Sequence, residues 1–370
     1  MIVESVWLKN FRNFEKLELK LDKDVNIFVG NNAQGKTNFL EAIYLCSTGH
    51  SWRTRLDREL IKFREDEAHI RVTVENRGLN KVDVHLKKDG KFFAKYVAIN
   101  GVSIKKLDQL FGNLLTVVFS PEDLQLIKAG PTERRRFMDM ELCQLSAVYF
   151  HELQQYYHVL KQRNRLLKNL KQNRDVDVLD VWDEQLVKHG AKIMKLRAEF
   201  IESLDGLARE VYGRLTDGRE SLKIVYRPNV SEDEFRAKLK KNIERDIILG
   251  ATSAGIHKDD LTFLIDTRVV GREAVKTGEV AEAREARVFG SQGQQRTVAL
   301  SVKLAEIKLI QERTGNDPVL LLDDVLSELD ESRQKFFLNN MSGVQTIITC
   351  TGLTIEKGTV YRVTDGSVSR

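Results

Sequence analysis

The residues with the clearest chemical potential form a polar loop with two glycines, GNNAQGKTN at positions 30–38. The run before it, VNIFV at 25–29, is β-branched and aromatic and predicts a buried strand, while NFLEAIYLC at 38–46 has apolar residues at helical spacing. The loop therefore has the pattern G-x-x-x-x-G-K-[ST] in the strand-to-helix context in which that pattern binds phosphate. Glycines let backbone N–H groups face a ligand, and the helix N-terminus adds partial positive charge. These residues predict a nucleotide site.

The polar residues of the loop have expected roles at a bound nucleoside triphosphate. Lys36 would reach the β and γ phosphates, and Thr37 would give its hydroxyl to Mg²⁺. The loop residues expected to contact ATP are Gly30, Asn31, Asn32, Gln34, Gly35, Lys36, Thr37 and Asn38. ATP and Mg²⁺ are thus the expected cofactors.

Two carboxylates end a second apolar run, PVLLLDDVLSELD at 318–330. This pattern is typical of a buried parallel strand that delivers carboxylates to the C-terminal edge of a sheet. Beside Thr37, Asp323 would hold Mg²⁺ through water, and Asp324 would orient or deprotonate the attacking water. Asp324 and Lys36 are therefore the predicted catalytic residues, and Thr37 and Asp323 are the predicted metal ligands.

A second small polar loop opens a long amphipathic helix in FGSQGQQRTVALSVKLAEIKLI at 289–310. Ser291 and Gly293 stand at the expected helix N-terminus, which makes a second anion site. One chain does not need two phosphate sites for one nucleotide. We therefore expect this loop to reach the ATP held by another copy, which would close a symmetric homodimer over two ATP molecules.

Length and composition favour an intracellular protein of two domains. The chain has 370 residues, of which 31% are charged, and its net charge is +5 from 59 Lys+Arg against 54 Asp+Glu, which is mild for a nucleic-acid binder. The three cysteines are far apart and suggest neither a disulfide framework nor a zinc site. No signal sequence or membrane-length apolar run is present, so we expect a soluble protein.

Hydrophobic periodicity divides the chain into strand-rich and helix-rich parts. Alternating segments with turn signals predict an antiparallel meander at 17–21, 69–75, 81–87 and 91–99. Apolar steps of three and four at 142–170 and 179–211, with a polar break between them, predict two helices of roughly 35 residues in an antiparallel hairpin. Strand patterns return at 222–226, 261–266 and 318–323, and we predict a linker at 271–287. We predict an α/β head from 1–112 and 250–370 with an inserted, mainly helical domain at 113–249.

Several motifs together carry a family resemblance. Ser291 to Gln295 resemble the signature motif of ABC-type ATPases, and SELD at 327–330 resembles their D-loop. The motifs follow one another as phosphate loop, long insertion, signature and carboxylates. This order is similar to that in the chromosome-maintenance and repair branch of the ABC-type ATPases. Within that branch the chain resembles, over its whole length, the RecF family of bacterial recombination-repair ATPases. The segments that carry this likeness are LKNFRNF (8–14), GNNAQGKTNFLEAI (30–43), VVFSPEDL (117–124), GPTERRRFMD (130–139), HKDDL (257–261) and SQGQQRT (291–297).

The resemblance implies an ABC-type ATPase head that dimerises with ATP, hydrolyses it slowly with DNA as a stimulus, and binds double-stranded or gapped DNA without sequence specificity. It implies action with RecO and RecR to load RecA in DNA repair, replication and the SOS response, in the cytoplasm at the nucleoid. It also places Gln294 with Ser291 and Gly293 at the nucleotide, and Arg12 and either Arg53 or Arg55 near phosphate.

Three departures from the ABC pattern favour slow, switch-like use of ATP. TIITCTG at 346–352 has threonines where transporter cassettes have a switch histidine, Ser120 stands where a Q-loop glutamine is expected, and Asp324 is shorter than the usual glutamate. Two other functions stay open. A transporter's nucleotide-binding subunit is opposed by the missing histidine and the helical insertion, and a structural scaffold is opposed by Asp323 and Asp324.

DNA contacts are the less determined part of the sequence. The candidates for phosphate contact are Arg134, Arg135, Arg136, Arg163, Arg165 and Lys168, and each could equally belong to a solvated helix face. No motif for base readout is present, so we expect contacts to the DNA backbone.

Overall fold

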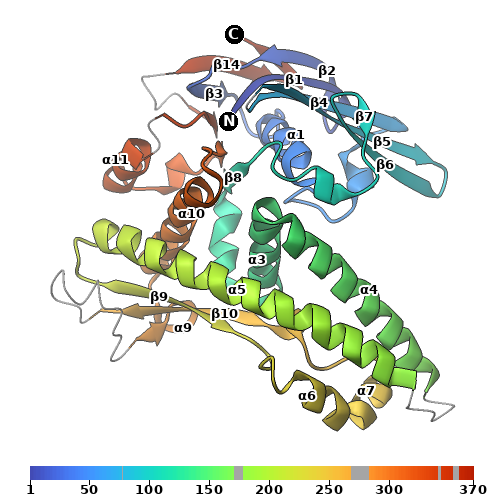
Figure 1. Ribbon diagram of the computed structural model, residues 1–370. Coiled ribbons are helices and arrows are strands. Elements are labelled where there is room, and N and C mark those ends of the chain that lie inside the picture. Colours follow the sequence, from blue (N-terminus) through green and yellow to red (C-terminus); the bar gives the residue numbers. More distant parts are fainter. Residues whose placement is uncertain (77, 171–177, 268–282, 341–342, 353–357) are drawn as a thin grey trace. The chain divides into compact units, whose positions relative to one another are not determined.

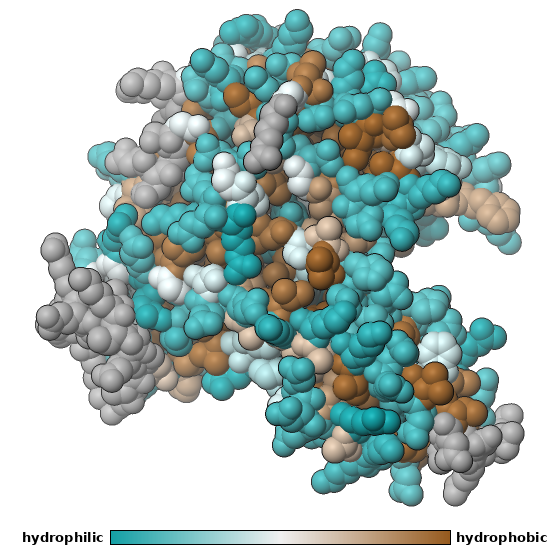
Figure 2. All heavy atoms as spheres, viewed as in Figure 1, coloured by the Kyte–Doolittle hydropathy of each residue, from teal (hydrophilic) through white to brown (hydrophobic). Residues whose placement is uncertain are grey.

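The computed structural model describes residues 1–370 except 77, 171–177, 268–282, 341–342 and 353–357. The chain divides into two compact units, a first unit of Met1–Asp123 with Glu306–Arg370 and a second unit of Leu124–Ala305. On the face drawn in Figure 2, hydrophilic residues predominate and hydrophobic ones lie in small groups among them. None of the helices in the described ranges has the length and apolar character needed to cross a bilayer.

The first unit contains an antiparallel sheet of six strands in the order β2-β1-β4-β5-β6-β7. Its strands are β1 (Ile2–Phe11), β2 (Phe14–Lys20), β4 (Glu67–Glu75), β5 (Leu79–Asp89), β6 (Phe92–Ile99) and β7 (Val102–Ser103). Along β4 and β5 the apolar residues alternate with polar ones, so one face of the sheet joins the core and the other meets solvent. The predicted meander is confirmed in type and place.

A second six-stranded sheet of the first unit, with the order β15-β14-β3-β13-β12-β8, carries the nucleotide loop. Its strands are β3 (Val25–Val29), β8 (Thr116–Phe119), β12 (Val319–Asp323), β13 (Thr346–Cys350), β14 (Thr359–Thr364) and β15 (Ser367–Ser369). All neighbours are parallel except β14 and β15. The parallel strands therefore end at one common edge.

Helix α1 (Lys36–Thr48) lies between these two sheets (Figure 1). It contacts β1, β4 and β5 of the antiparallel sheet, and β8, β12 and β13 of the parallel one. Eleven of its 13 residues are buried, from Phe39 to Thr48 and at Lys36. An apolar sequence on every side, as in NFLEAIYLC, is what a helix enclosed by two sheets requires. This burial fixes the start of α1, and with it the phosphate loop.

The second unit contains three long helices: α3 (Pro131–Leu145), α4 (Ala147–Asn169) and α5 (Leu179–Leu215). Helices α4 and α5 pack side by side as the predicted hairpin. The second helix has 37 residues, close to expectation, but the first is divided at Ser146. Ser146 has an extended backbone, and its hydroxyl accepts the N–H of Tyr149, which starts a new helix at Ala147.

A small sheet with the order β11-β10-β9 completes the second unit with several shorter helices. These elements are β9 (Ser221–Arg227), β10 (Asp260–Asp266), β11 (Arg284–Glu285), α2 (Gln125–Lys128), α6 (Phe235–Lys241), α7 (Ile243–Leu249) and α9 (Ala286–Phe289). Helix α10 (Gln292–Thr314) begins in the second unit and ends in the first. The second unit thus extends to Ala305, beyond the boundary of 249 expected from the sequence. Most of the expected linker at 271–287 lies outside the described residues.

Candidate nucleotide-binding site

The phosphate loop follows β3, which pairs with β13 on one side and β14 on the other. Two glycines are required by their surroundings. A Cβ at Gly30 would lie 2.4 Å from the carbonyl oxygen of Val363, and Gly35 has φ 111° with the side chain of Asn13 only 2.5 Å from where its Cβ would be. Asn13 also donates its amide N–H to the carbonyl of Gln34 at 2.8 Å. The loop is therefore held in one conformation by residues outside the motif.

The Lys36 ammonium lies over the loop and is 7% exposed. It donates to the carbonyl oxygens of Gly30 at 2.6 Å and Asn31 at 2.8 Å. Lys36 is also the first residue of α1, whose first-turn N–H groups have no partner within the helix. Positive charge and free donors thus meet where the sequence predicts the phosphates.

The two predicted metal ligands are in contact although they are far apart in the sequence. The Thr37 hydroxyl donates to Asp323 Oδ1 at 2.7 Å, and the hydroxyl of Thr349 donates to the same oxygen at 2.8 Å. Strand β12 brings Asp323 to the edge of the sheet opposite Thr349 on β13. A hydroxyl and a carboxylate beside a phosphate loop are the oxygen ligands that Mg²⁺ takes, with waters completing its octahedron. The donor set therefore fits Mg²⁺.

Asp324 stands directly after this contact with a left-handed backbone, φ 53°. Its N–H donates to both oxygens of Thr349, at 3.2 Å to the carbonyl and 3.1 Å to the hydroxyl. The carbonyl of Asp324 accepts the hydroxyl of Ser327, the first residue of the predicted D-loop, at 2.7 Å. Thr349 thus positions both Asp323 and Asp324. The sequence analysis considered it only as one of the threonines found where transporter cassettes have a switch histidine.

A buried carboxylate, Glu41 on α1, binds two of the arginines that the sequence placed near phosphate. Arg12 donates to Glu41 through Nε at 2.9 Å and Nη2 at 2.7 Å, and Arg53 donates to it at 3.2 Å. Arg53 also donates to the Asn38 side chain at 2.8 Å, which links it to the end of the loop. Arg53 and Arg55 are both exposed. Sequence reasoning missed Glu41, although a charged residue in an apolar helix was the available signal.

The signature loop lies at the start of α10 in the second unit. The Ser291 hydroxyl accepts the N–H of Gln294 at 3.2 Å, and the Gln294 side chain accepts the N–H of Ser291 at 2.8 Å, which is a reciprocal helix cap. Gln294 is further held by Glu220 at 2.8 Å. Ser291 and Gly293 are exposed, so the helix N-terminus is open to an external ligand.

Two arginines predicted to contact DNA are buried. Arg163 on α4 is 0% exposed and pairs with Asp183 at 2.5 Å and Asp246 at 2.8 Å. Arg134 is 2% exposed and makes a two-pronged pair with Asp260 at 2.6 and 3.0 Å. These guanidinium groups neutralise carboxylates inside the second unit. The structure therefore contradicts the prediction that Arg163 and Arg134 present their charge to DNA.

The other four candidates retain some access to solvent. Arg135 is half-buried and donates to the carbonyl of Asp259 at 2.7 Å, and Arg136, also half-buried, lies 3.9 Å from Glu133. Arg165 and Lys168 are exposed on α4. Ser120, which stands where a Q-loop glutamine was expected, is buried, and its backbone N–H donates to Asp123 Oδ2 at 2.8 Å.

The parallel sheet with its phosphate loop, the Thr37–Asp323 contact, the adjoining antiparallel sheet and the signature loop at a helix start define an ABC-type P-loop ATPase fold. The family model described as the RecF/RecN/SMC N terminal domain matches residues 2–364, and the chain belongs to this family.

Named relatives and solved structures agree with this assignment. The chain is 48% identical over 378 residues to the DNA replication and repair protein RecF of Lachnoclostridium phytofermentans, and 42% identical over 383 residues to that of Clostridium botulinum, with 100% of both chains covered in each comparison. A solved structure of the recombination mediator protein RecF with ATP matches with a TM-score of 0.90 at 34% identity, covering 100% of this chain and 97% of the other. An Smc head bound to the winged-helix domain of ScpA shares the fold alone, with a TM-score of 0.55 at 15% identity, covering 100% and 97%.

Proposed function

We propose that this protein is an ATP-dependent DNA-binding protein of replication and repair, in which bound ATP closes a homodimer around DNA and slow hydrolysis reopens it. The observation that carries the proposal is the contact of Thr37 with Asp323 beside Lys36, because it supplies a phosphate-binding cation and a complete Mg²⁺ donor pair in one place. The relatives named DNA replication and repair protein RecF support the DNA-directed part.

Each residue of the site has one task in this proposal. Lys36 holds the β and γ phosphates, and the first-turn N–H groups of α1 add donors. Thr37 and Asp323 would hold Mg²⁺, which would offset the negative charge of the phosphates. Asp324 orients or deprotonates the attacking water. Thr349, bonded to both aspartate residues, keeps them in register, and the shorter reach of Asp324 makes hydrolysis slow.

Dimerisation supplies the second half of the site. The helix N-terminus at Ser291 and Gly293 is exposed and preformed by its reciprocal cap, and one chain does not need a second phosphate site for its own nucleotide. The partner copy's ATP is the ligand of suitable charge in a symmetric pair. ATP would then act as the link between two copies, and its hydrolysis would release them.

DNA binding follows from the exposed basic residues of α4, with Arg165 and Lys168 as the phosphate contacts and Arg135 and Arg136 as further candidates. The DNA is double-stranded or gapped and is not read by sequence. With RecO and RecR, the dimer would promote RecA loading at gaps, and it would work in the cytoplasm at the nucleoid. The solved relative described as a recombination mediator in the RecFOR pathway supports these partners.

Light scattering with and without nucleotide tests this function. We expect a monomer without nucleotide and a dimer with Mg²⁺ and a non-hydrolysable ATP analogue, and we expect Lys36→Ala to stay monomeric in both conditions. A wild-type dimer that forms equally without nucleotide, or a monomer that persists with saturating analogue, would refute ATP-driven closure and favour a scaffold whose nucleotide is structural.

A further inference from the structure

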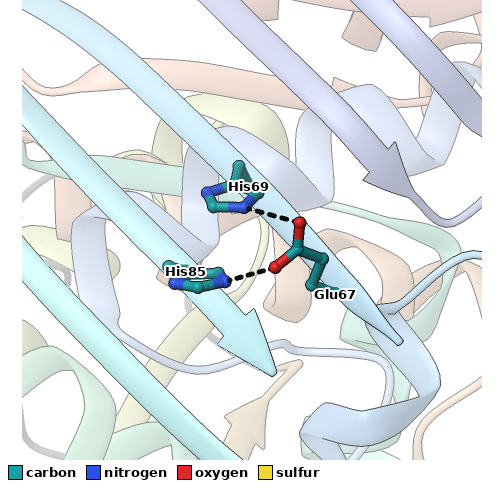
Figure 3. Close-up of side chains that lie close together, drawn as sticks. All are labelled: Glu67, His69 and His85. Atoms are coloured by element: carbon teal, nitrogen blue, oxygen red, sulfur yellow. Dashed lines mark hydrogen bonds and ion pairs between the residues drawn. The ribbon is translucent and has the colours of Figure 1, made fainter. Parts of the chain in front are cut away.

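A cluster of two histidines and a glutamate lies on the antiparallel sheet of the first unit, outside the nucleotide site (Figure 3). His69 on β4 stands directly opposite His85 on β5, and Glu67 precedes His69 by two residues. Successive residues of a strand point to opposite faces, so all three side chains share one face. Their neighbours Ala68, Ile70 and Leu86 are buried, which places the cluster on the outer face of the sheet.

The three side chains converge on one point rather than spreading over the sheet. The two imidazole rings are stacked, with centroids 3.9 Å apart and an angle of 12° between planes. Glu67 Oε1 lies 3.6 Å from His69 Nε2, and Glu67 Oε2 lies 3.3 Å from His85 Nε2. Within the described part of the chain, this is the one group of three potential metal ligands whose donor atoms all lie within 4.8 Å of one another.

Glu67 and His85 make a long hydrogen bond at 3.3 Å, and the 3.6 Å between Glu67 and His69 is longer still, so both separations are also compatible with ligands that share a cation. N–H···O bonds in proteins centre near about 2.9 Å, so contacts of 3.3 and 3.6 Å are long ones. Two ligands at about 2.05 Å from a tetrahedral Zn²⁺ stand roughly 3.3 Å apart. Because the lone pair of each Nε2 lies in its ring plane, the two stacked rings would have to turn out of their stack to point both lone pairs at one ion, and half-exposed side chains have room to do so. The strand pairing therefore brings the three ligands close together.

The cluster is open to solvent, because Glu67, His69 and His85 are each half-buried on the outer face of the sheet. Trp7 packs edge-on against His69 with centroids 6.4 Å apart, and Tyr96 lies beside His85 at 5.8 Å.

The charged neighbours on this face do not occupy the cluster. Lys9 and Lys87, which stand opposite His69 and Glu67 in the strand registers, are exposed and can extend into water. Arg71 is held by Asp83 at 2.6 Å. Positive charge nearby lowers the affinity for a cation, so we expect a site weaker than a buried structural one.

We propose that Glu67, His69 and His85 form a binding site for a late first-row divalent transition metal ion, with Zn²⁺ as the ion that the imidazole and carboxylate ligands fit. Two imidazoles and a carboxylate are a recognised ligand set for such ions, and Ca²⁺ or Mg²⁺ would prefer oxygen ligands throughout. Three protein ligands leave a fourth position open for water or for a donor from another molecule. Bound Zn²⁺ would cross-link β4 to β5 at the surface of the sheet.

Isothermal titration of the full-length protein with ZnCl₂ tests the site, with Mg²⁺ in large excess to occupy the all-oxygen site at Thr37 and Asp323. We expect one equivalent in wild type that binds Zn²⁺ more tightly than isolated surface histidines do. His69→Gln and His85→Gln each remove a direct ligand, so each should weaken that equivalent by more than the roughly 10–100-fold that loss of an outer-shell partner costs. His151→Gln, which changes an exposed histidine on α4, is the matched control and should bind as wild type does.

Co²⁺ substitution gives a second readout that does not depend on stability. The visible d–d absorption of bound Co²⁺ should appear in wild type and in His151→Gln, and should vanish in both cluster variants. Circular dichroism of the metal-free variants checks the fold, which should persist because the three side chains are half-exposed. Unchanged Zn²⁺ affinity in His69→Gln and His85→Gln, or no such equivalent in wild type, would overturn the proposal and leave the cluster as a packed cross-strand pair.

Discussion

Replacing Arg163 should damage the stability of the second unit rather than its contact with DNA. Three polar groups depend on this guanidinium: Asp183 at 2.5 Å, Asp246 at 2.8 Å and the hydroxyl of Thr252 at 2.9 Å. They come from α5, from α7 and from the loop after α7, while Arg163 belongs to α4. Arg163→Met keeps much of the volume but leaves two carboxylates, 1% and 0% exposed, without a counter-charge.

The magnitude follows from that burial. Removing one partner of a buried ion pair costs about 3–5 kcal/mol, and here a single substitution strands two carboxylates. For a unit of this size we expect the unfolding temperature to fall by on the order of 10 °C. Thermal unfolding followed by circular dichroism measures the change. Arg165→Met, two positions further along α4 and exposed, is the matched control and should stay within about 0.5 kcal/mol of wild type.

A rescue variant makes the test specific. Asp183→Asn and Asp246→Asn together remove the stranded charges, so the triple variant with Arg163→Met should recover part of the lost stability. If Arg163→Met unfolds at the wild-type temperature but binds DNA more weakly, the assignment of Arg163 as an internal ion-pair partner is wrong and the original expectation of a DNA contact returns.

Three further predictions concern catalysis, DNA binding and pH. Asp324→Asn keeps the size of the side chain but removes its basicity, so it should bind ATP normally, hydrolyse it poorly and persist as a dimer; wild-type turnover in a phosphate-release assay would remove Asp324 from the catalytic role. If about five DNA phosphates are neutralised, log affinity should fall with log salt at a slope of about −4 to −5, and Arg165→Ala with Lys168→Ala should make the slope shallower by about 2; an unchanged slope in fluorescence anisotropy would clear both residues. Burial lowers the pKa of His257 from 6.5 to about 4, so the unfolded chain takes up a proton first as pH falls. The free energy of unfolding should therefore be full above pH 6.5 and decrease towards pH 4 by about 3 kcal/mol, and denaturant titrations of His257→Gln should lack this contribution; equal pH dependence of the two proteins would contradict it.

The parts of the fold that the sequence predicted correctly are those set by local pattern. The alternation of apolar and polar residues at 69–75 and 81–87 directly indicates strands of a sheet with one buried face. The motif at 30–38 is flanked by the strand and the helix that its pattern requires. The single long helix expected before residue 170 was wrong because apolar spacing continues across Ser146. Only the capping bond from Tyr149 and the extended backbone of Ser146 end one helix and begin the next.

The site shows the same division between local and distant causes. The positions of Lys36, Thr37 and Asp323 beside one another were predictable because the phosphate loop and the strand-end carboxylate are local signals. Thr349 and Glu41 were not, because their roles depend on partners from other strands and loops. The prediction for Arg163 was wrong for the same reason. Helical spacing relates only residues three or four positions apart, so a basic stretch on α4 does not reveal that Asp246 on α7, 83 residues later, binds Arg163.

The central claim, that each ATP is shared between Lys36 of one copy and Ser291 of the other, is tested most directly by mixing two inactive variants. Lys36→Ala and Ser291→Arg should each abolish ATP hydrolysis in a homodimer. A heterodimer of the two collects both lesions in one site and leaves the other site intact, so we predict that turnover returns on mixing, provided one site can act alone. Wild type paired with a Lys36→Ala, Ser291→Arg double variant should instead lose activity in every heterodimer. If the first mixture stays inactive and the second keeps its wild-type half, the site lies within single subunits and the account is contradicted.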